Sequence, residues 1–283
     1  MATAEALLKK FKELKTLPHV AIRLSKLISD ENTTMQEFEN LIKMDPTLVL
    51  RLLRTVNSSY YGLRQKVSTI SRAVMLIGMK NLRNLVVTEA IKDIFGQSSN
   101  ENVFSRRKLW LHCAVVAICS QMISERIFSK KGDNAFLCGI LHDIGMIVED
   151  QVAHDLFIQV CKIYEPESKP ITDYEREILG TDHCAVGYLL IRDWQLPVEV
   201  QEGIKQHHQE LEDVSPSSIT GIIQIAEYFV SKLNYTAIPG ADAILSPPLV
   251  AHISDNIEEY KVLINDLPDE MSKAKALYES QEE

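Results

Sequence analysis

The chain has 283 residues, of which 46% are hydrophobic and 24% are charged, a composition typical of folded soluble proteins and not of disordered chains. Its formal net charge of -9 argues against a strong nonspecific grip on nucleic acid or anionic lipid, because such binding depends on clustered lysine and arginine. The five cysteines include no C-x-x-C pair, so we expect free thiols in a reducing, cytoplasmic compartment and no membrane association.

Helical periodicity runs through the whole sequence. Apolar residues recur at i, i+3 and i+4, and strand-like alternation is nearly absent. The sequence therefore predicts an all-α fold of two helical lobes. The first residues, MATAEALLKKFKELKTL, already place leucines and charges at helical spacing, unlike the uninterrupted apolar run of a signal peptide.

The N-terminal lobe contains two clear helix starts. Thr34 and Glu37 form a capping-box pattern, in which the hydroxyl and the carboxylate satisfy opposite free N–H groups of the first turn. At Asp45-Pro46 another helix is predicted, with Asp as the N-cap and Pro at the position whose missing donor costs nothing.

Residues 71–95 are apolar on both sides of Gly78. Two short helices joined at that glycine and one longer helix both agree with this pattern. At low resolution the segment is similar to a DNA-binding helix-turn-helix, but its basic residues are diluted by Glu89 and Asp93. Strong nucleic-acid binding is therefore not expected.

Polar residues 97–102 form the clearest interruption of the sequence and suggest a boundary between lobes. The expected parts are an N-terminal helical lobe, a second helical lobe that carries most of the histidines, and a C-terminal loop with helices that pack on the core, over residues 1–98, 99–236 and 237–283.

Longer helices are predicted in the second half over residues 108–127, 134–148 and 196–208. The prolines at Ser246-Pro-Pro indicate a loop-rich connection, after which Tyr260 belongs to a predicted helix before the charged tail.

Seven side chains in the second half are candidate metal ligands. They are His112, His142, Asp143, His183, His207, His208 and Glu227. Adjacent helical residues are about 100° apart, so His142 and Asp143 can converge on one site, with the carboxylate able to bridge two ions. His207 and His208 follow Ile204 on the predicted core side of their helix, so both are expected to face inward. Glu227 lies in an apolar stripe, where a lone carboxylate needs a proton, a cation or a metal.

Each of these residues also has an ordinary structural alternative. A single inward histidine such as His112 or His183 can be a hydrogen-bonded core residue. The pair His207-His208 can be a helix end favoured by the helix dipole, and Glu227 can lie at the edge of its stripe or meet an arginine. Spacing within one helix leaves these alternatives open.

Several segments follow, in order, the motifs of a known family. In the second half the chain carries LCGILHDIG, GTDHCAVGYLL and IKQHH, and in the first half it carries LPHVAIRLSKLI, KMDPTLVLRLLRTVNSSYYG and ISRAVMLIGMKNLRNLVV. This series, which covers roughly residues 17–234, resembles the HDOD family, regulatory relatives of the HD-domain metal phosphohydrolases.

The resemblance implies an all-α module of bacterial signal transduction that acts by binding a signalling protein or a ligand and has no settled enzymatic activity. The seven candidate ligands match the family's series, with Glu227 where an Asp is usual, and imply one or two divalent ions. Mixed imidazole and carboxylate ligands suit Fe, Mn, Zn or Ni. The alternative is a metal-dependent phosphohydrolase acting on a nucleotide or cyclic dinucleotide, as in the related HD-GYP phosphodiesterases.

Departures from the active HD-GYP enzymes disfavour catalysis. Met146 stands where a lysine helps to hold phosphate, and Lys108 stands where a further acidic ligand is expected. The GYP segment is replaced by QELEDVSPSS after the two adjacent histidines. We therefore assign no catalytic residue and expect an exposed binding patch on the first lobe.

Overall fold

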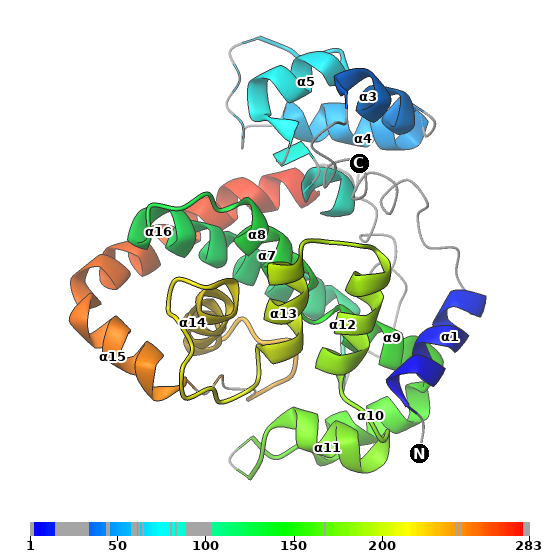
Figure 1. Cartoon of the computed structure of the whole chain (residues 1–283), viewed down its shortest axis with the longest axis vertical. Coiled ribbons are helices and arrows are strands. Elements are labelled where there is room, and N and C mark those ends of the chain that lie inside the picture. The colour runs from blue at the N-terminus through cyan, green and yellow to red at the C-terminus, as the bar shows by residue number, and fades with distance from the viewer. Residues whose placement is uncertain are drawn as a thin grey trace. The chain divides into compact units, whose positions relative to one another are not determined.

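The computed structural model describes residues 3–14, 34–43, 46–57, 61, 63, 65–79, 81–82, 84–88, 103–166, 168–240, 243 and 245–279. Within these ranges the chain forms helices and their connections, without any β-strand (Figure 1). The predicted all-α fold is confirmed. No helix in the described part of the chain has a stretch long and apolar enough to cross a bilayer.

The chain divides into two compact units. Unit 1 contains residues 1–16 and 94–264, and unit 2 contains residues 17–93 and 265–283. The first helix, α1 (Ala4–Leu14), packs on α12 (His183–Asp193) and α9 (Ile144–Val152). The N-terminal residues therefore group with the histidine-bearing unit, which differs from the expected lobe of residues 1–98. The polar segment 97–102 lies outside the described residues.

Unit 2 begins with the capping box expected from the sequence. The backbone N–H of Glu37 donates to Thr34 Oγ1 at 3.3 Å, and the backbone N–H of Thr34 donates to Glu37 Oε2 at 2.9 Å. Helix α3 (Met35–Lys43) starts directly after Thr34, and Glu37 lies in its first turn. Helix α4 (Pro46–Val56) begins with its proline, as predicted, while Asp45 is outside the described residues.

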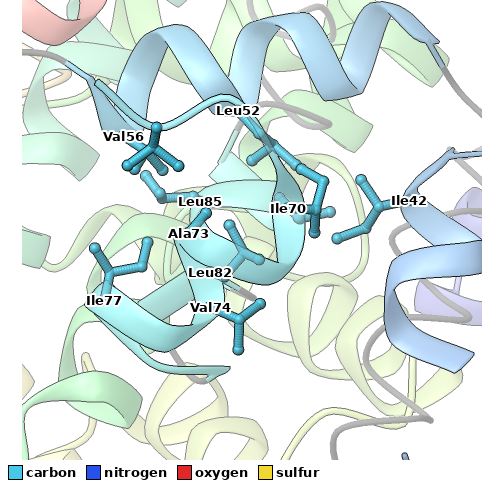
Figure 2. Close-up of a cluster of buried hydrophobic side chains, with 11 residues drawn as sticks. Ile42, Leu52, Val56, Ile70, Ala73, Val74, Ile77, Leu82 and Leu85 are labelled. Atoms are coloured by element: carbon cyan, nitrogen blue, oxygen red, sulfur yellow. The ribbon is translucent and has the colours of Figure 1, made fainter. Parts of the chain in front are cut away.

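Gly78 separates two helices in unit 2. Helix α5 (Ile70–Ile77) ends there because the glycine adopts φ +82°, and described residues between 79 and 88 are helical again. The two-helix alternative is therefore confirmed. Figure 2 shows the core that these helices share with α3 and α4, built from aliphatic side chains such as Ile42, Leu52, Ile70 and Leu82, which are 0–2% exposed.

Unit 1 is a bundle built around the long helix α7. Its remaining elements are α7 (Arg106–Met122), a π-helical turn (Ile123–Ile127), α8 (Asp133–Leu141), α10 (His154–Ile163), α11 (Ile171–Ile178), α13 (Val198–Gln206), α14 (Ile219–Lys232), α15 (Pro247–Asp255) and α16 (Ile257–Glu279), the last of which continues into unit 2. Helix α7 packs on α8 and α14, and α13 lies between α12 and α14 (Figure 1).

The structure differs from the predicted elements at two places. The single helix expected over 134–148 is broken, because α8 ends at Leu141 and α9 begins at Ile144. The loop expected at Ser246-Pro-Pro instead starts α15, with the prolines in the first turn, where a missing N–H costs nothing. The first of these breaks positions the metal-binding candidates.

Candidate metal centre

All seven candidate ligands lie in unit 1 and converge from five segments of the chain. His112 lies on α7, His142 and Asp143 fill the break between α8 and α9, and His183 is the first residue of α12. His207 and His208 follow the end of α13, and Glu227 lies on α14. The side chains meet one another, so none of these histidines is an isolated core residue.

Three of the side chains, His112, His142 and Glu227, form what we call the Glu227 group. Oε1 of Glu227 lies 3.1 Å from Nε2 of His112 and 2.8 Å from Nε2 of His142. The two Nε2 atoms are 3.2 Å apart. All three side chains are buried. The Glu227 carboxylate therefore does not lie at the exposed edge of the apolar face of α14.

The other three histidines, His183, His207 and His208, form what we call the His207 group. Nε2 of His183 lies 3.3 Å from Nε2 of His207, and the His207 and His208 rings are 4.2 Å apart between centroids. His207 is fully buried, but the side chain of His208 is 24% exposed. The expectation that both adjacent histidines face inward is thus correct for His207 and only partly so for His208.

Asp143 lies between the two groups and turns one oxygen toward each. Oδ2 is 3.5 Å from Nε2 of His112 and 3.2 Å from Nε2 of His142. Oδ1 is 3.4 Å from Nε2 of His183 and 3.5 Å from Nε2 of His207. Oδ1 is buried and accepts no hydrogen bond. A buried carboxylate oxygen without a donor is costly, and a bound cation would satisfy it.

The four buried imidazoles are all oriented by hydrogen bonds at Nδ1. The acceptors are the carbonyl of Tyr235 for His112 (2.6 Å), that of Gly139 for His142 (2.7 Å), that of Ile204 for His207 (2.7 Å), and the carboxylate of Glu175 for His183 (2.7 Å). With Nδ1 donating, each neutral ring presents the Nε2 lone pair to the centre. This arrangement is typical of metal-binding histidines.

Glu175 on α11 was not identified from the sequence. Its carboxylate also accepts the backbone N–H of His183 at 3.0 Å, and it is fully buried. The signal that could have found it is the one used for Glu227. Glu175 falls in the apolar stripe of its helix with Ile171, Tyr174 and Ile178, where an unpaired carboxylate would be costly.

Gly145 allows the break after α8 to pack against α12. A Cβ atom at this position would lie 2.0 Å from the carbonyl oxygen of His183, far inside van der Waals contact. Only glycine lets the first turn of α9 approach the start of α12 this closely. The approach brings Asp143 toward His183.

The electrostatics of the cluster favour added positive charge. Burial by itself lowers the pKa of His142, but the carboxylates of Asp143 and Glu227 outweigh it and raise that pKa well above its usual value. Burial by itself raises the pKa values of Asp143 and Glu227, yet the facing imidazoles, with His142 foremost, hold both well below the usual range. Both carboxylates therefore remain ionised, and a divalent ion would compete with protons for the imidazoles.

The spacing of the donor atoms fits a metal ion. Two ligand atoms about 2.0–2.1 Å from one ion and 90–109° apart are separated by about 2.8–3.4 Å. The separations within the Glu227 group are 2.8–3.2 Å, and Asp143 Oδ1 and the Nε2 atoms of His183 and His207 are 3.3–3.5 Å apart. The residues present thus suit one ion on each side of Asp143.

A cysteine also borders the His207 group. Sγ of Cys184 lies 3.6 Å from Nε2 of His183 and 3.9 Å from Nε2 of His207. The sequence analysis did not single it out, although it directly follows His183, because a free thiol ordinarily behaves as a small core residue.

A cavity of about 60 Å³ opens onto the cluster and is lined by His112, Asp143, Met146, Tyr164, Pro170, Ile171, His208, Glu227, Ser231, Thr236, Ala237, Ile238 and Ala243. None of these described lining residues is lysine or arginine. The cavity has room for a few water molecules, and its described lining offers no lysine or arginine to a phosphate.

A family model described as the HDOD domain matches residues 14–210. Among curated proteins, an uncharacterised protein of Treponema pallidum (strain Nichols) is 24% identical over 210 residues, which cover 72% of this chain and 39% of that protein. The match thus spans about two-fifths of the relative's length.

Solved structures show the same fold. A protein of Shewanella amazonensis SB2B whose name proposes a phosphohydrolase is 25% identical, with a TM-score of 0.70 and coverage of 96% of this chain and 97% of that one. An HDOD domain protein of unknown function from Geobacter sulfurreducens is 23% identical, with a TM-score of 0.66 and coverage of 92% and 97%. A protein of Marinobacter aquaeolei VT8 whose name proposes a role in signal transduction is 18% identical, with a TM-score of 0.73 and coverage of 94% and 60%.

Proposed function

Because the chain belongs to the HDOD family, we propose that it is a bacterial signal-transduction regulator that acts by binding a partner protein and holds one or two divalent ions in unit 1. The observation that carries this proposal is the composition of the cavity over the cluster. Met146 lies in its wall, and the described lining residues include no lysine or arginine to hold a substrate phosphate.

The metal part of the proposal rests on donor geometry. The Nε2 atoms of four oriented imidazoles, Glu227 and both oxygens of Asp143 meet at ligand–ligand distances. The donor set suits Fe, Mn, Zn or Ni. Elemental analysis of protein purified without chelator should find metal in the wild type and much less in His142→Ala. Equal metal in both would contradict the proposal.

A metal-dependent phosphohydrolase acting on a nucleotide or cyclic dinucleotide is the second candidate. The observation in its favour is the division of the Asp143 carboxylate between two ligand groups, as expected of a carboxylate that bridges two ions. Such a centre supplies Lewis-acid activation of water. In this chain Asp143 would hold the ions, but the cavity residues offer little to orient a phosphoester.

A turnover assay separates the two candidates. Metal-loaded protein is incubated for hours with a panel of nucleotides and cyclic dinucleotides in the presence of Mn²⁺ or Fe²⁺. We expect no hydrolysis. Hydrolysis that disappears in Asp143→Asn would make the phosphohydrolase the correct function.

Binding of a protein partner is supported by exposed apolar side chains on unit 2. Leu50, Met75 and Leu76 are 60%, 75% and 51% exposed, and Met75 is the most exposed large apolar side chain of the described residues. We expect Met75→Glu to abolish capture of the partner from a lysate of the native host. Val262→Glu, at a position 61% exposed in unit 1, is the matched control. Equal capture by both variants would show that the partner binds a surface other than the one around Met75.

A further inference from the structure

Cys184 differs from Cys119 and Cys138 in what surrounds its sulfur. Cys119 and Cys138 are buried in the bundle, and Sγ of Cys138 donates to the carbonyl of Val200 at 3.8 Å. Burial raises the pKa of the Cys119 thiol to about 12. Cys184, which is 5% exposed, instead directs Sγ toward two imidazole nitrogens, at 3.6 Å from His183 and 3.9 Å from His207.

These distances approach those of ligands around one tetrahedral ion. A sulfur about 2.3 Å and a nitrogen about 2.0 Å from a common zinc ion are separated by about 3.5 Å, and two such nitrogens by about 3.3 Å. The two nitrogens here are 3.3 Å apart. A small rotation of the Cys184 side chain would bring the longer sulfur–nitrogen distance to the same range.

Asp143 gives independent evidence for a cation at this position. Its Oδ1 is buried without a hydrogen bond and faces the same two nitrogens, at 3.4 Å for His183 and 3.5 Å for His207. A thiol and an unpaired carboxylate oxygen thus both lie against one pair of imidazole lone pairs. An ion at this position would be bound by Oδ1 and the two nitrogens, and the Cys184 sulfur lies beside the same two nitrogens.

We propose that Cys184 is a thiolate ligand of the ion held by Asp143, His183 and His207, an inference that rests on the proposed metal centre. On binding, the Cys184 S–H bond releases one proton and the sulfur lone pair is donated to the ion. The proton has a path to solvent, since Cys184 also lines a cavity of about 220 Å³ with Lys205 and Glu5.

The proposal distinguishes the two sides of Asp143. The Glu227 group offers nitrogen and oxygen, whereas the side of the His207 group gains a soft sulfur ligand. Soft ligands favour Zn²⁺ or iron over Mn²⁺. The two positions should therefore differ in the metal that they prefer.

Cobalt substitution of the full chain tests the ligand directly. A thiolate bound to Co²⁺ produces a near-ultraviolet charge-transfer band, which imidazole and carboxylate ligands do not produce. We expect this band in the wild type and its loss in Cys184→Ser, with circular dichroism confirming that the variant is folded. Cys138→Ser, a buried cysteine away from the nitrogens, should keep the band.

Cys113 is the rival sulfur, because it lies within 4.8 Å of ligand atoms of His142 and Asp143. A band lost in Cys113→Ser and kept in Cys184→Ser would overturn the proposal. X-ray absorption of zinc-loaded wild type supplies a measurement that needs no variant, and a sulfur scatterer at about 2.3 Å is expected.

The remaining outcomes separate this inference from the metal centre itself. Bound Co²⁺ without a charge-transfer band, or without sulfur in the absorption spectrum, refutes Cys184 as a ligand and leaves the centre intact. Wild-type protein that binds no Co²⁺ or Zn²⁺ in equilibrium dialysis refutes both.

Discussion

Replacing Glu175 by glutamine should weaken both the fold and metal binding. The Glu175 carboxylate accepts the Nδ1–H of His183 at 2.7 Å and the backbone N–H of the same residue at 3.0 Å. Both side chains are completely buried. Both of these donors bond Oε2, and Nδ1 of His183 also lies 2.9 Å from Oε1. The glutamine amide keeps one acceptor oxygen, so its NH₂ group replaces one of the two oxygens and leaves a buried donor facing another donor.

The size of the effect follows from these two hydrogen bonds. A buried donor without a partner costs about 1–3 kcal/mol, which is the expected loss in the free energy of unfolding of the metal-free protein. Loss of the group that orients a ligating histidine typically reduces metal affinity by about 10–100-fold, or about 1.4–2.7 kcal/mol.

The two losses are measured separately. Urea unfolding of chelator-treated protein gives the first, and competition between the protein and a chelator for Zn²⁺ gives the second. Glu177→Gln is the control, because Glu177 lies on the same helix with a side chain 63% exposed and pairs only with Lys169 across the surface. It should change either quantity little.

If Glu175→Gln loses the expected free energy of unfolding but keeps its zinc affinity, His183 does not bind metal. Unchanged values for both quantities would refute the hydrogen-bond geometry from which the prediction was made.

Three further changes test other parts of unit 1. Gly145→Ala places a Cβ 2.0 Å from the His183 carbonyl oxygen, and we expect a loss of about 3 kcal/mol or more in urea unfolding; a loss below about 1 kcal/mol would contradict the close approach. Burial, then Glu175, raises the pKa of Glu149 well above 4.5, so the folded chain holds this proton more tightly than the unfolded chain and stability falls as pH rises above about 4.5. Glu149→Gln should flatten the decline in urea midpoint as pH rises above about 4.5, and an unchanged slope would refute this reasoning. Arg106 Nε donates to the buried carboxylate of Asp150, so Arg106→Met should lower the free energy of unfolding by about 3 kcal/mol. The double variant Arg106→Met with Asp150→Leu should recover much of this loss. Full additivity of the two single losses would argue against a coupled pair.

Local sequence signals predicted local structure well. The capping box at Thr34 and Glu37 and the helix start at Pro46 depend on interactions within one turn, and the structure contains both. The break at His142 could not be predicted in this way. It depends on the approach of Gly145 to His183, a contact between helices that periodicity does not encode.

The spacing of residues along the sequence could not predict that the candidate ligands converge. His112 and Glu227 are 115 residues apart and meet at 3.1 Å, which the helical stripe of neither residue specifies. The ordered motifs of a family supplied the missing long-range information. Glu175 and Cys184 were missed for opposite reasons. The first carries a readable signal in its apolar stripe. The second is adjacent to His183, but a thiol suits a buried position with or without a metal, so this adjacency does not identify a ligand.

The shared carboxylate of Asp143 makes the two halves of the centre thermodynamically dependent on each other. An ion on one side draws on the single negative charge of Asp143, and the second ion then meets both a weakened ligand and a like charge. Linkage makes this penalty reciprocal, so filling should be anticooperative. A form with one bound ion would persist over a wide range of ion concentration. As the metal concentration rises, the protein would therefore pass through three states, with no, one and two bound ions.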